Sequence, residues 1–251
     1  MTLDAYTAAP IVAAPFIGSF LAVVAIRLMQ QRTVLFGRSA CDACGATLGP
    51  LELIPLVSFA ALRGRCRHCG AKIDPLHPVM EAGALVIAVW AALVTDGWIV
   101  AASCGLGWTL LTLAAIDWRT GYLPDVLTLP LIAAGLGVAY AIDPSVLSVL
   151  LGHVIGAAAG FIAFAALSEG YRRLRGRDGL GLGDAKLLAA SGAWLSWSGL
   201  PTTVLYAAFL GLALVLLRRG QSLKAADTLA FGPPLAAATW LVWLYGPLVP
   251  G

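Results

Sequence analysis

Two sets of residues in this sequence could bind a metal or catalyse a reaction, namely two pairs of cysteines and a pair of aspartates. Cys41 and Cys44 form one Cys-x-x-Cys pair, and Cys66 and Cys69 form a second. Two such pairs can supply the four thiolates of a tetrahedral zinc site. Because four thiolates leave no open coordination position, we expect a structural metal and no catalysis at this site.

A disulfide framework is the main alternative for these cysteines, and it requires an oxidising compartment. Gly45 and Gly70 follow the second cysteine of each pair, where a zinc knuckle needs a tight turn. His68 lies inside the second pair, and its exchange into the ligand set is the less favoured arrangement. The choice between zinc and disulfides therefore depends on the compartment in which the cysteines lie. That compartment follows from the membrane topology.

The aspartates stand in two motifs, Ile116-Asp-Trp-Arg-Thr-Gly-Tyr-Leu-Pro-Asp125 and Gly181-Leu-Gly-Asp-Ala-Lys186. Ionisable groups at the edges of membrane spans are most often simply solvated. Here, however, Asp117 and Asp184 are predicted at the same membrane face, and Asp184 follows a Gly-x-Gly turn that permits close backbone approach. Two neighbouring carboxylates do not readily ionise together, so one keeps a proton while the other acts as a base. Such a pair suits water-mediated hydrolysis of a peptide bond.

Membrane spans must position these residues. The chain of 251 residues is 60% hydrophobic and 12% charged, whereas soluble domains carry about 25% charged residues. Since a span needs about 20 mostly apolar residues, we predict an all-α polytopic membrane protein with about eight transmembrane helices. Their expected ranges are 9–28, 79–95, 98–116, 123–142, 146–167, 182–198, 201–217 and 229–246. The uncharged run 187–217 counts as two spans because Ser196-Trp-Ser-Gly-Leu-Pro201 is typical of a turn.

Lysine and arginine set the orientation of the spans. With eight spans, the basic loops 29–78, 168–180 and 218–228 fall on one side together with Arg119, and this side is predicted to be the cytoplasm. The reducing cytoplasm favours zinc over disulfides. We therefore divide the chain into a first transmembrane helix at 1–28, a cytoplasmic zinc-binding loop at 29–78 and a transmembrane core at 79–251. The net charge of +3 fits the loops of a membrane protein, and no nucleic acid is expected as a partner.

Taken together, these motifs resemble those of the GxGD-type membrane aspartyl proteases, and more closely those of the type IV prepilin leader peptidases. The resemblance covers nearly the whole chain, and it rests on Gly181-Leu-Gly-Asp184, Asp117, Leu123-Pro-Asp125, the four cysteines, Gly18-Ser-Phe-Leu21 and Phe231-Gly-Pro233. It implies that Asp117 and Asp184 are the catalytic pair, with supporting positions at Asp125, Gly181, Gly183, Lys186 and Glu81. Glu81 is singled out also because an acid that enters a bilayer needs a partner.

The resemblance implies an endopeptidase of the bacterial cytoplasmic (inner) membrane with its active site facing the cytoplasm. Its substrates would be the basic leaders of type IV prepilins or pseudopilins. Many family members then N-methylate the new N-terminus, so S-adenosylmethionine is an expected cofactor beside structural zinc. The sequence assigns no residues to this donor, because no glycine-rich nucleotide fingerprint follows a strand. It predicts no particular oligomeric state.

Two other classes of protein fit part of the pattern. An ion-coupled transporter would use Asp117 and Asp184 as a proton relay, but a relay favours carboxylates near the bilayer midplane, in broken spans. A non-catalytic assembly factor would bind a partner through the zinc loop, and it leaves the aspartate motifs without a role. A serine hydrolase is disfavoured, because no G-x-S-x-G motif is present and His153 is the only histidine outside the loop 29–78.

Overall fold

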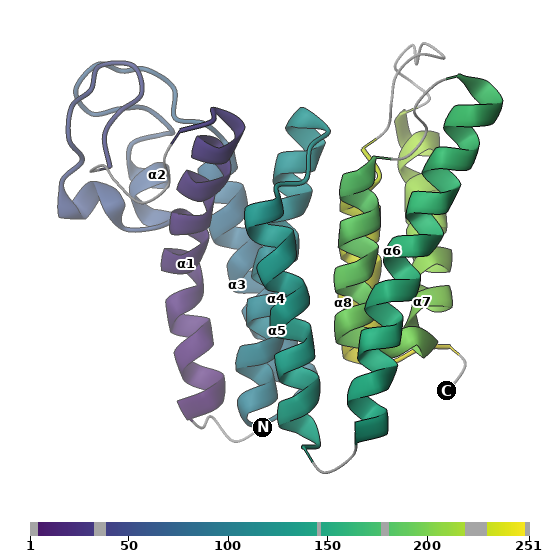
Figure 1. Cartoon of the computed structure of the whole chain (residues 1–251). Coiled ribbons are helices and arrows are strands. Elements are labelled where there is room, and N and C mark those ends of the chain that lie inside the picture. Colours follow the sequence, from purple (N-terminus) through teal and green to yellow (C-terminus); the bar gives the residue numbers. More distant parts are fainter. Residues whose placement is uncertain (1–4, 33–38, 145–146, 177–180, 219–229, 249–251) are drawn as a thin grey trace. The chain divides into compact units, whose positions relative to one another are not determined.

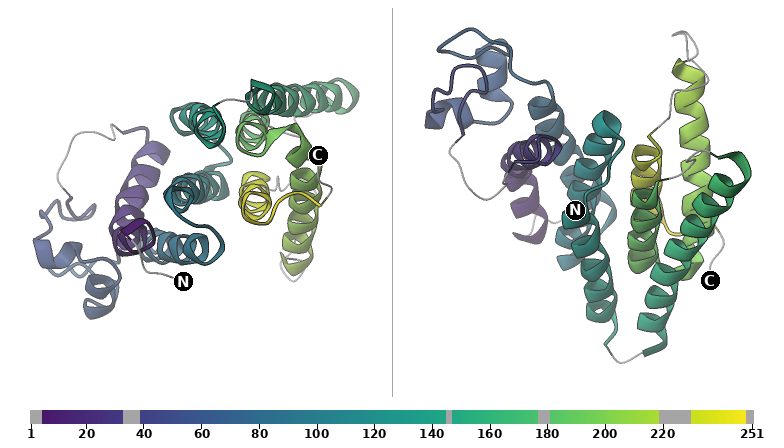
Figure 2. Two further views of the ribbon diagram at one scale, coloured as in Figure 1. Left: turned by 90° about the horizontal axis from the view of Figure 1, so that it is seen from below. Right: turned by 45° about the horizontal axis from the view of Figure 1, so that its top comes forward.

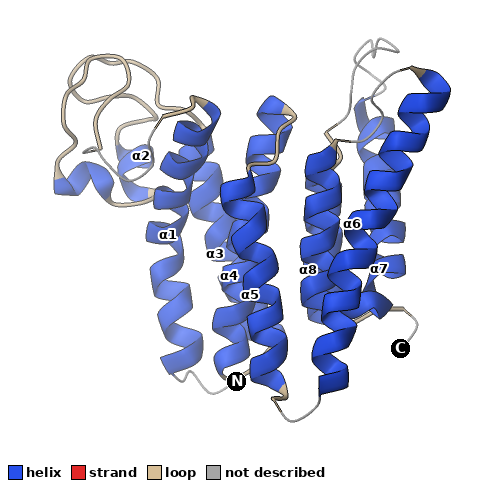
Figure 3. Ribbon diagram, in the orientation of Figure 1, coloured by secondary structure: helices blue, strands red, loops and turns tan. Residues whose placement is uncertain are grey.

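The computed structural model describes residues 5–32, 39–144, 147–176, 181–218 and 230–248. Within these ranges the regular structure is helical, apart from two isolated β-bridges (Figure 3). The long helices are α1 (Ala5–Met29), α3 (Leu76–Val94), α4 (Trp98–Thr120), α5 (Asp125–Ile142), α6 (Leu147–Arg175) and α7 (Leu182–Arg218). All six are long and apolar enough to cross a bilayer. The predicted all-α polytopic membrane fold is confirmed.

Helix α7 consists of two helical parts joined by a sharp turn. It contains 37 residues, and an unbroken helix of that length would measure about 55 Å, well beyond a hydrocarbon core of about 30 Å. The backbone is non-helical at Ser196, with φ 63° and ψ 174°. In Figure 1 the two parts of α7 run in opposite directions. The turn predicted from the sequence around this serine is therefore confirmed.

The last apolar segment is α8 (Gly232–Tyr245), which has 14 residues and is shorter than the predicted range 229–246. Proline near the first position of α8 explains where the helix begins, because its ring suits the first turn and prevents an earlier start. With both parts of α7 and with α8, the described residues contain eight apolar helical segments, as predicted.

The chain is divided into two compact units, Met1–Thr112 and Leu113–Gly251. The first unit holds α1, α3, most of α4 and the segment between α1 and α3. That segment contains a 3-10 helix, η1 (Pro50–Leu53), and α2 (Val57–Ala61), and it lies beside the C-terminal end of α1 (Figures 1 and 2). Gly18 allows α1 to pack directly on α3, since a Cβ at this position would lie 2.5 Å from the carbonyl oxygen of Met80.

The second unit holds the end of α4 together with α5, α6, α7 and α8. Gly156 and Gly160 of α6 bring that helix against the backbone of α7, where a Cβ at Gly160 would lie 2.6 Å from the carbonyl oxygen of Leu188. In lipid the hydrophobic effect does not bring helices together, so association depends on close van der Waals packing. Small residues such as these glycines allow the two backbones to approach closely. The buried indole N–H of Trp194 donates to the Leu131 carbonyl at 2.9 Å and ties α7 to α5. These contacts fix the first part of α7, which carries Asp184.

Candidate functional site

Both predicted catalytic aspartates line one cavity of about 290 Å³ in the second unit. Asp117 comes from the last turn of α4 and Asp184 from the first turn of α7. Their side chains are buried, with relative exposures of 5% and 9%. The same cavity is lined by four of the five predicted supporting residues, namely Asp125, Gly181, Gly183 and Lys186. Residues separated by more than sixty positions in the sequence are thus collected around two buried carboxylates.

The position of Asp117 depends on two glycines. Gly121 ends α4 with φ +65° and donates its N–H to the Asp117 carbonyl at 2.8 Å. Gly232, the first residue of α8, donates its N–H to Asp117 Oδ2 at 2.9 Å. Helix N-terminal N–H groups have no partner inside their own helix and favour a carboxylate. A Cβ at Gly232 would lie only 2.5 Å from this oxygen, so glycine is required for the contact.

One oxygen of Asp184 is left for chemistry. Its Oδ2 accepts the Gly181 N–H at 3.2 Å, whereas Oδ1 is buried and has no hydrogen-bond partner in the described part of the chain. A buried acceptor without a partner is destabilising by about 1–3 kcal/mol, and a water or a substrate group in the cavity would satisfy it. Gly183 permits the close approach that the sequence predicted, because a Cβ there would lie 2.9 Å from Leu123 Cβ.

Lys186 and Asp125, which both line the cavity, form an ion pair with 2.5 Å between Nζ and Oδ1. The Asp125 side chain is half exposed, and exposed pairs of this kind contribute about 0–1 kcal/mol of stability. The pair joins the start of α5 to the start of α7, so its main consequence is to hold these two helix ends together beside the aspartates.

Glu81 does not line the aspartate cavity, although the sequence grouped it with the supporting residues. It lies in the first unit near the start of α3, where Oε2 accepts the Leu56 N–H at 2.7 Å. Leu56 has a backbone φ of 60°, which is unfavourable for a bulky residue other than glycine. The predicted need of Glu81 for a partner is therefore met by a backbone N–H, and the contact attaches the loop between α1 and α3 to α3.

The four paired cysteines form one cluster in the first unit. Their Sγ atoms all lie within 4.8 Å of one another, and Cys41 Sγ is 3.9 Å from Cys69 Sγ. Four thiolates at about 2.3 Å from a tetrahedral zinc ion would be about 3.8 Å apart. The donor set and its spacing therefore fit a metal ion. His68 is not part of this cluster.

The two cysteine pairs adopt the same local turn. The Gly45 N–H donates to the Cys41 carbonyl at 2.8 Å, and the Gly70 N–H donates to the Cys66 carbonyl at 2.9 Å. Both glycines have positive φ, +70° and +72°, a conformation that side chains rarely adopt. The predicted turns are confirmed, and each presents two thiols to the centre of the cluster.

Electrostatics in the cluster also favour a cation. Hydrogen bonds from the backbone N–H groups of Cys44 and Ala43 lower the pKa of the Cys41 thiol to about 7. At Cys69 a backbone hydrogen bond from Ala71 acts to lower the pKa, but burial and the three neighbouring thiols raise it to about 11. The described cysteines are free thiols. A bound divalent cation would allow all four to ionise together.

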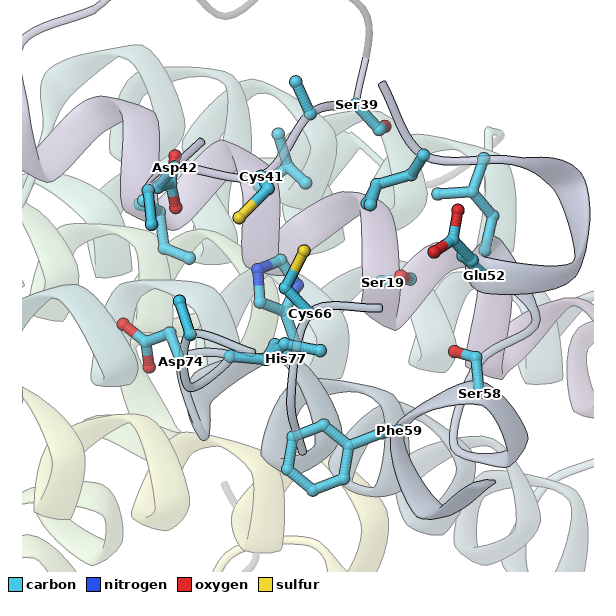
Figure 4. Close-up of a pocket in the computed structure, with 18 of the residues that line it drawn as sticks. Ser19, Ser39, Cys41, Asp42, Glu52, Ser58, Phe59, Cys66, Asp74 and His77 are labelled. Carbon is cyan, nitrogen blue, oxygen red and sulfur yellow. The ribbon is translucent and has the colours of Figure 1, made fainter. Parts of the chain in front are cut away.

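A second cavity of about 460 Å³ lies in the first unit, between the end of α1, the cysteine loop and the start of α3 (Figure 4). Cys41 and Cys66 form part of its wall, and Glu81 lines it as well. This cavity was not predicted from the sequence, because its wall combines three segments whose packing no local motif specifies. Gly232 was also missed as a contact of Asp117, although the Phe231-Gly-Pro233 motif that contains it was noted.

Two family models match successive parts of the chain. The model of the bacterial peptidase A24 N-terminal domain matches residues 12–95, and the model of the type IV leader peptidase family matches residues 104–216. No solved structure matches the chain.

Similar curated proteins are prepilin leader peptidase/N-methyltransferases. That of Burkholderia pseudomallei is 44% identical over 213 residues, which cover 83% of this chain and 67% of the relative. That of Aeromonas salmonicida is 39% identical over 228 residues, covering 86% and 74%. That of Pseudomonas aeruginosa is 33% identical over 260 residues, covering 92% and 87%.

Proposed function

Because the chain belongs to the type IV leader peptidase family, we propose that it is a membrane-embedded aspartyl endopeptidase that cleaves the leader from type IV prepilins or pseudopilins. The observation that carries this proposal is the cavity lined by both Asp117 and Asp184. Both residues lie inside the segment that the family model matches. A transporter is not supported, since both acids stand in terminal turns of their helices and the relatives are peptidases.

Cleavage would proceed by general acid–base catalysis. One aspartate takes a proton from a water molecule, which attacks the scissile carbonyl carbon, and the other aspartate, protonated, donates a hydrogen bond to the carbonyl oxygen. The proton then passes to the leaving amine, and no covalent enzyme intermediate forms. Asp184 Oδ1 is the unpaired acceptor that suits the water, while Asp117 is oriented by Gly232. The buried site keeps bulk water away from both carboxylates.

The proposal is tested by incubating purified full-length protein in detergent with a purified prepilin and following the products by mass spectrometry. A single cut between leader and mature pilin is expected, without added metal or nucleotide. Intact precursor after prolonged incubation, with a characterised prepilin peptidase as the positive control, would contradict the proposed function.

The active site would lie on the cytoplasmic side of the inner membrane. With eight spans, the loops rich in lysine and arginine all fall on the same side as the aspartates, and such loops are cytoplasmic. In a background that lacks the five native cysteines, an Arg173→Cys variant, changed at an exposed position near the end of α6, should resist a membrane-impermeant maleimide in spheroplasts and react after lysis. Asp96→Cys, at an exposed position between α3 and α4, should react without lysis. The reverse pattern would place the aspartates on the outer side.

Zinc is the metal we propose for the four-cysteine cluster, since thiolates at this spacing prefer it among abundant metals. The purified protein is expected to contain about one zinc ion per chain, measured by elemental analysis. Cys66→Ser should lose most of the metal and destabilise the loop, because structural zinc supplies folding free energy. Cys104→Ser is the matched control, as Cys104 is a buried thiol of α4 outside the cluster. Full retention of zinc by Cys66→Ser would rule out this site.

The relatives' second activity, N-methylation, is proposed for the new N-terminus of the cleaved pilin. S-adenosylmethionine is the expected donor, and it supplies an electrophilic methyl group. The chain's own residues must bind this donor and orient the pilin amine beside it.

A further inference from the structure

An apolar segment interrupts the polar loop between α1 and α3. Residues 49–62 contain one charged side chain, Glu52, whereas the rest of the loop is rich in arginine, lysine and aspartate. The segment forms η1 and α2, but several of its large apolar side chains point away from the protein, and Leu51 and Val57 are 75% and 63% exposed. Exposed apolar patches of this kind mark surfaces that contact another molecule or a membrane. The exposed large apolar residues of this patch are Leu51, Leu53, Ile54 and Val57.

The position of this segment along α1 indicates what surrounds it. The N–H of Leu56 donates to Glu81 Oε2 at 2.7 Å. The backbone of Glu81 lies against Gly18 of α1, where a Cβ would be 2.7 Å from the Glu81 Cα. Gly18 precedes Arg27, the only charged residue of α1, by nine positions, which correspond to about 13 Å along a helix. Leu56 is therefore held on the apolar side of Arg27, within the depth at which α1 crosses the bilayer.

Helix α2 lies at the same level as this apolar part of α1. Phe59 of α2 lines one cavity together with Ser19 and Val23 of α1, and Figure 1 shows α2 beside the upper half of α1. Phe20 of α1 and Val79 of α3 are 61% and 59% exposed at this level, as side chains that face lipid are. The exposed face of the segment therefore continues the lipid-facing surface of these two helices.

The backbone of the segment is suited to surroundings that contain little water. In lipid a backbone N–H without a partner is strongly unfavourable. Oε2 of Glu52 accepts the Gly49 N–H at 2.8 Å, and Glu81 accepts that of Leu56. The two prolines of the segment have no N–H to satisfy. Both carboxylates thus bind backbone donors on the inner side, while apolar side chains cover the outer side.

We propose that residues 50–61 form a membrane-interfacial segment, which inserts its exposed apolar side chains into the same lipid leaflet as the start of α3. Arg63 and Arg65 follow α2 closely and are exposed, so they are placed to meet lipid phosphates, as basic residues beside interfacial segments do. Because Cys66 comes next in the chain, the insertion holds the four-cysteine cluster against the membrane surface. This placement does not depend on the proposed cleavage activity.

The test is electron paramagnetic resonance on purified full-length protein in nanodiscs of phosphatidylethanolamine and phosphatidylglycerol. A ketone-bearing phenylalanine analogue replaces Val57 and carries a nitroxide, so the native cysteines stay untouched. Collisions of the nitroxide with oxygen, which concentrates in hydrocarbon, are compared with collisions with a polar nickel chelate. Since hydrocarbon excludes the chelate, the oxygen-to-nickel ratio at position 57 should be within about twofold of that at Phe20 and at least about fivefold above that at Thr47. Thr47 is the matched control, an exposed position of the same loop outside the apolar segment.

A second label at Leu51, in η1, should give the same high ratio, and it decides the matter if the label at Val57 lowers the melting temperature of the protein. A ratio like that at Thr47 would place the segment in water and overturn the proposal. Poor access of both reagents would show that protein covers the patch, either a second copy of this chain or another part of the same one. That result would overturn the proposal as well.

Discussion

Asp184→Asn and Asp117→Asn are each expected to lower the rate of prepilin cleavage by about a thousandfold or more, while the protein still inserts into the membrane. Asparagine matches aspartate in shape but can neither accept a proton from water nor donate one as an acid. General acid–base groups contribute about 10²–10⁴-fold in rate, and both carboxylates line the same cavity in the second unit. The measurement is the initial rate of leader release by purified protein.

The matched control is Asp96→Asn, at an exposed position between α3 and α4. Its cleavage rate should stay within about twofold of the wild-type rate, since exposed substitutions away from the site rarely perturb the fold. A motif variant that kept more than about a tenth of the wild-type rate would exclude a mechanism that needs both acids.

Gly232→Val should reduce kcat for cleavage by about tenfold to a hundredfold, because the N–H of Gly232 orients Asp117. A Cβ at this position would lie 2.5 Å from Asp117 Oδ2, so the carboxylate must move away from the N–H. Hydrogen bonds to charged groups contribute about 1.5–3 kcal/mol, and each 1.4 kcal/mol lost from the transition state is about tenfold in rate. Gly232→Ala should show a smaller loss in the same direction.

Gly137→Val on α5 is the control for this prediction. Gly137 is exposed, and a Cβ there would meet no atom within 4 Å. It introduces the same side chain in a helix of the same unit and should leave cleavage within about twofold, as surface substitutions usually do. Equal losses in the two valine variants would show that α-helical destabilisation, and not displacement of Asp117, causes the effect.

The helices were predictable because bilayer thickness fixes how long an uncharged segment must be. The turn at Ser196 was predictable for the same reason, since the run 187–217 is too long for one span. The start of α8 was placed too early, because apolar composition continues before Gly232 and does not mark where the helix begins. Boundaries depend on local hydrogen bonds, which composition does not encode.

The site was predictable where its residues form local motifs, and not where it depends on contacts between distant segments. The cysteine pairs and the Gly-x-Gly-Asp turn carry their geometry within a few residues. Asp117, by contrast, meets Gly232 across 115 positions, and Lys186 meets Asp125 across 61. The partner of Asp117 is a backbone N–H, which every residue except proline has. The sequence therefore does not indicate that the N–H of Gly232 binds Asp117.

The glycines between α6 and α7 limit how this protein can diverge. Gly192 faces Gly156, and each would place a Cβ into the backbone of the other helix. In most packed pairs, growth of one side chain can be offset by shrinkage of its neighbour, so that substitutions accumulate in compensated pairs. Here neither residue has a side chain to lose, and no second substitution can restore the fit. Lineages that descend from this sequence should therefore vary on the lipid-facing sides of these two helices while this crossing point stays as it is.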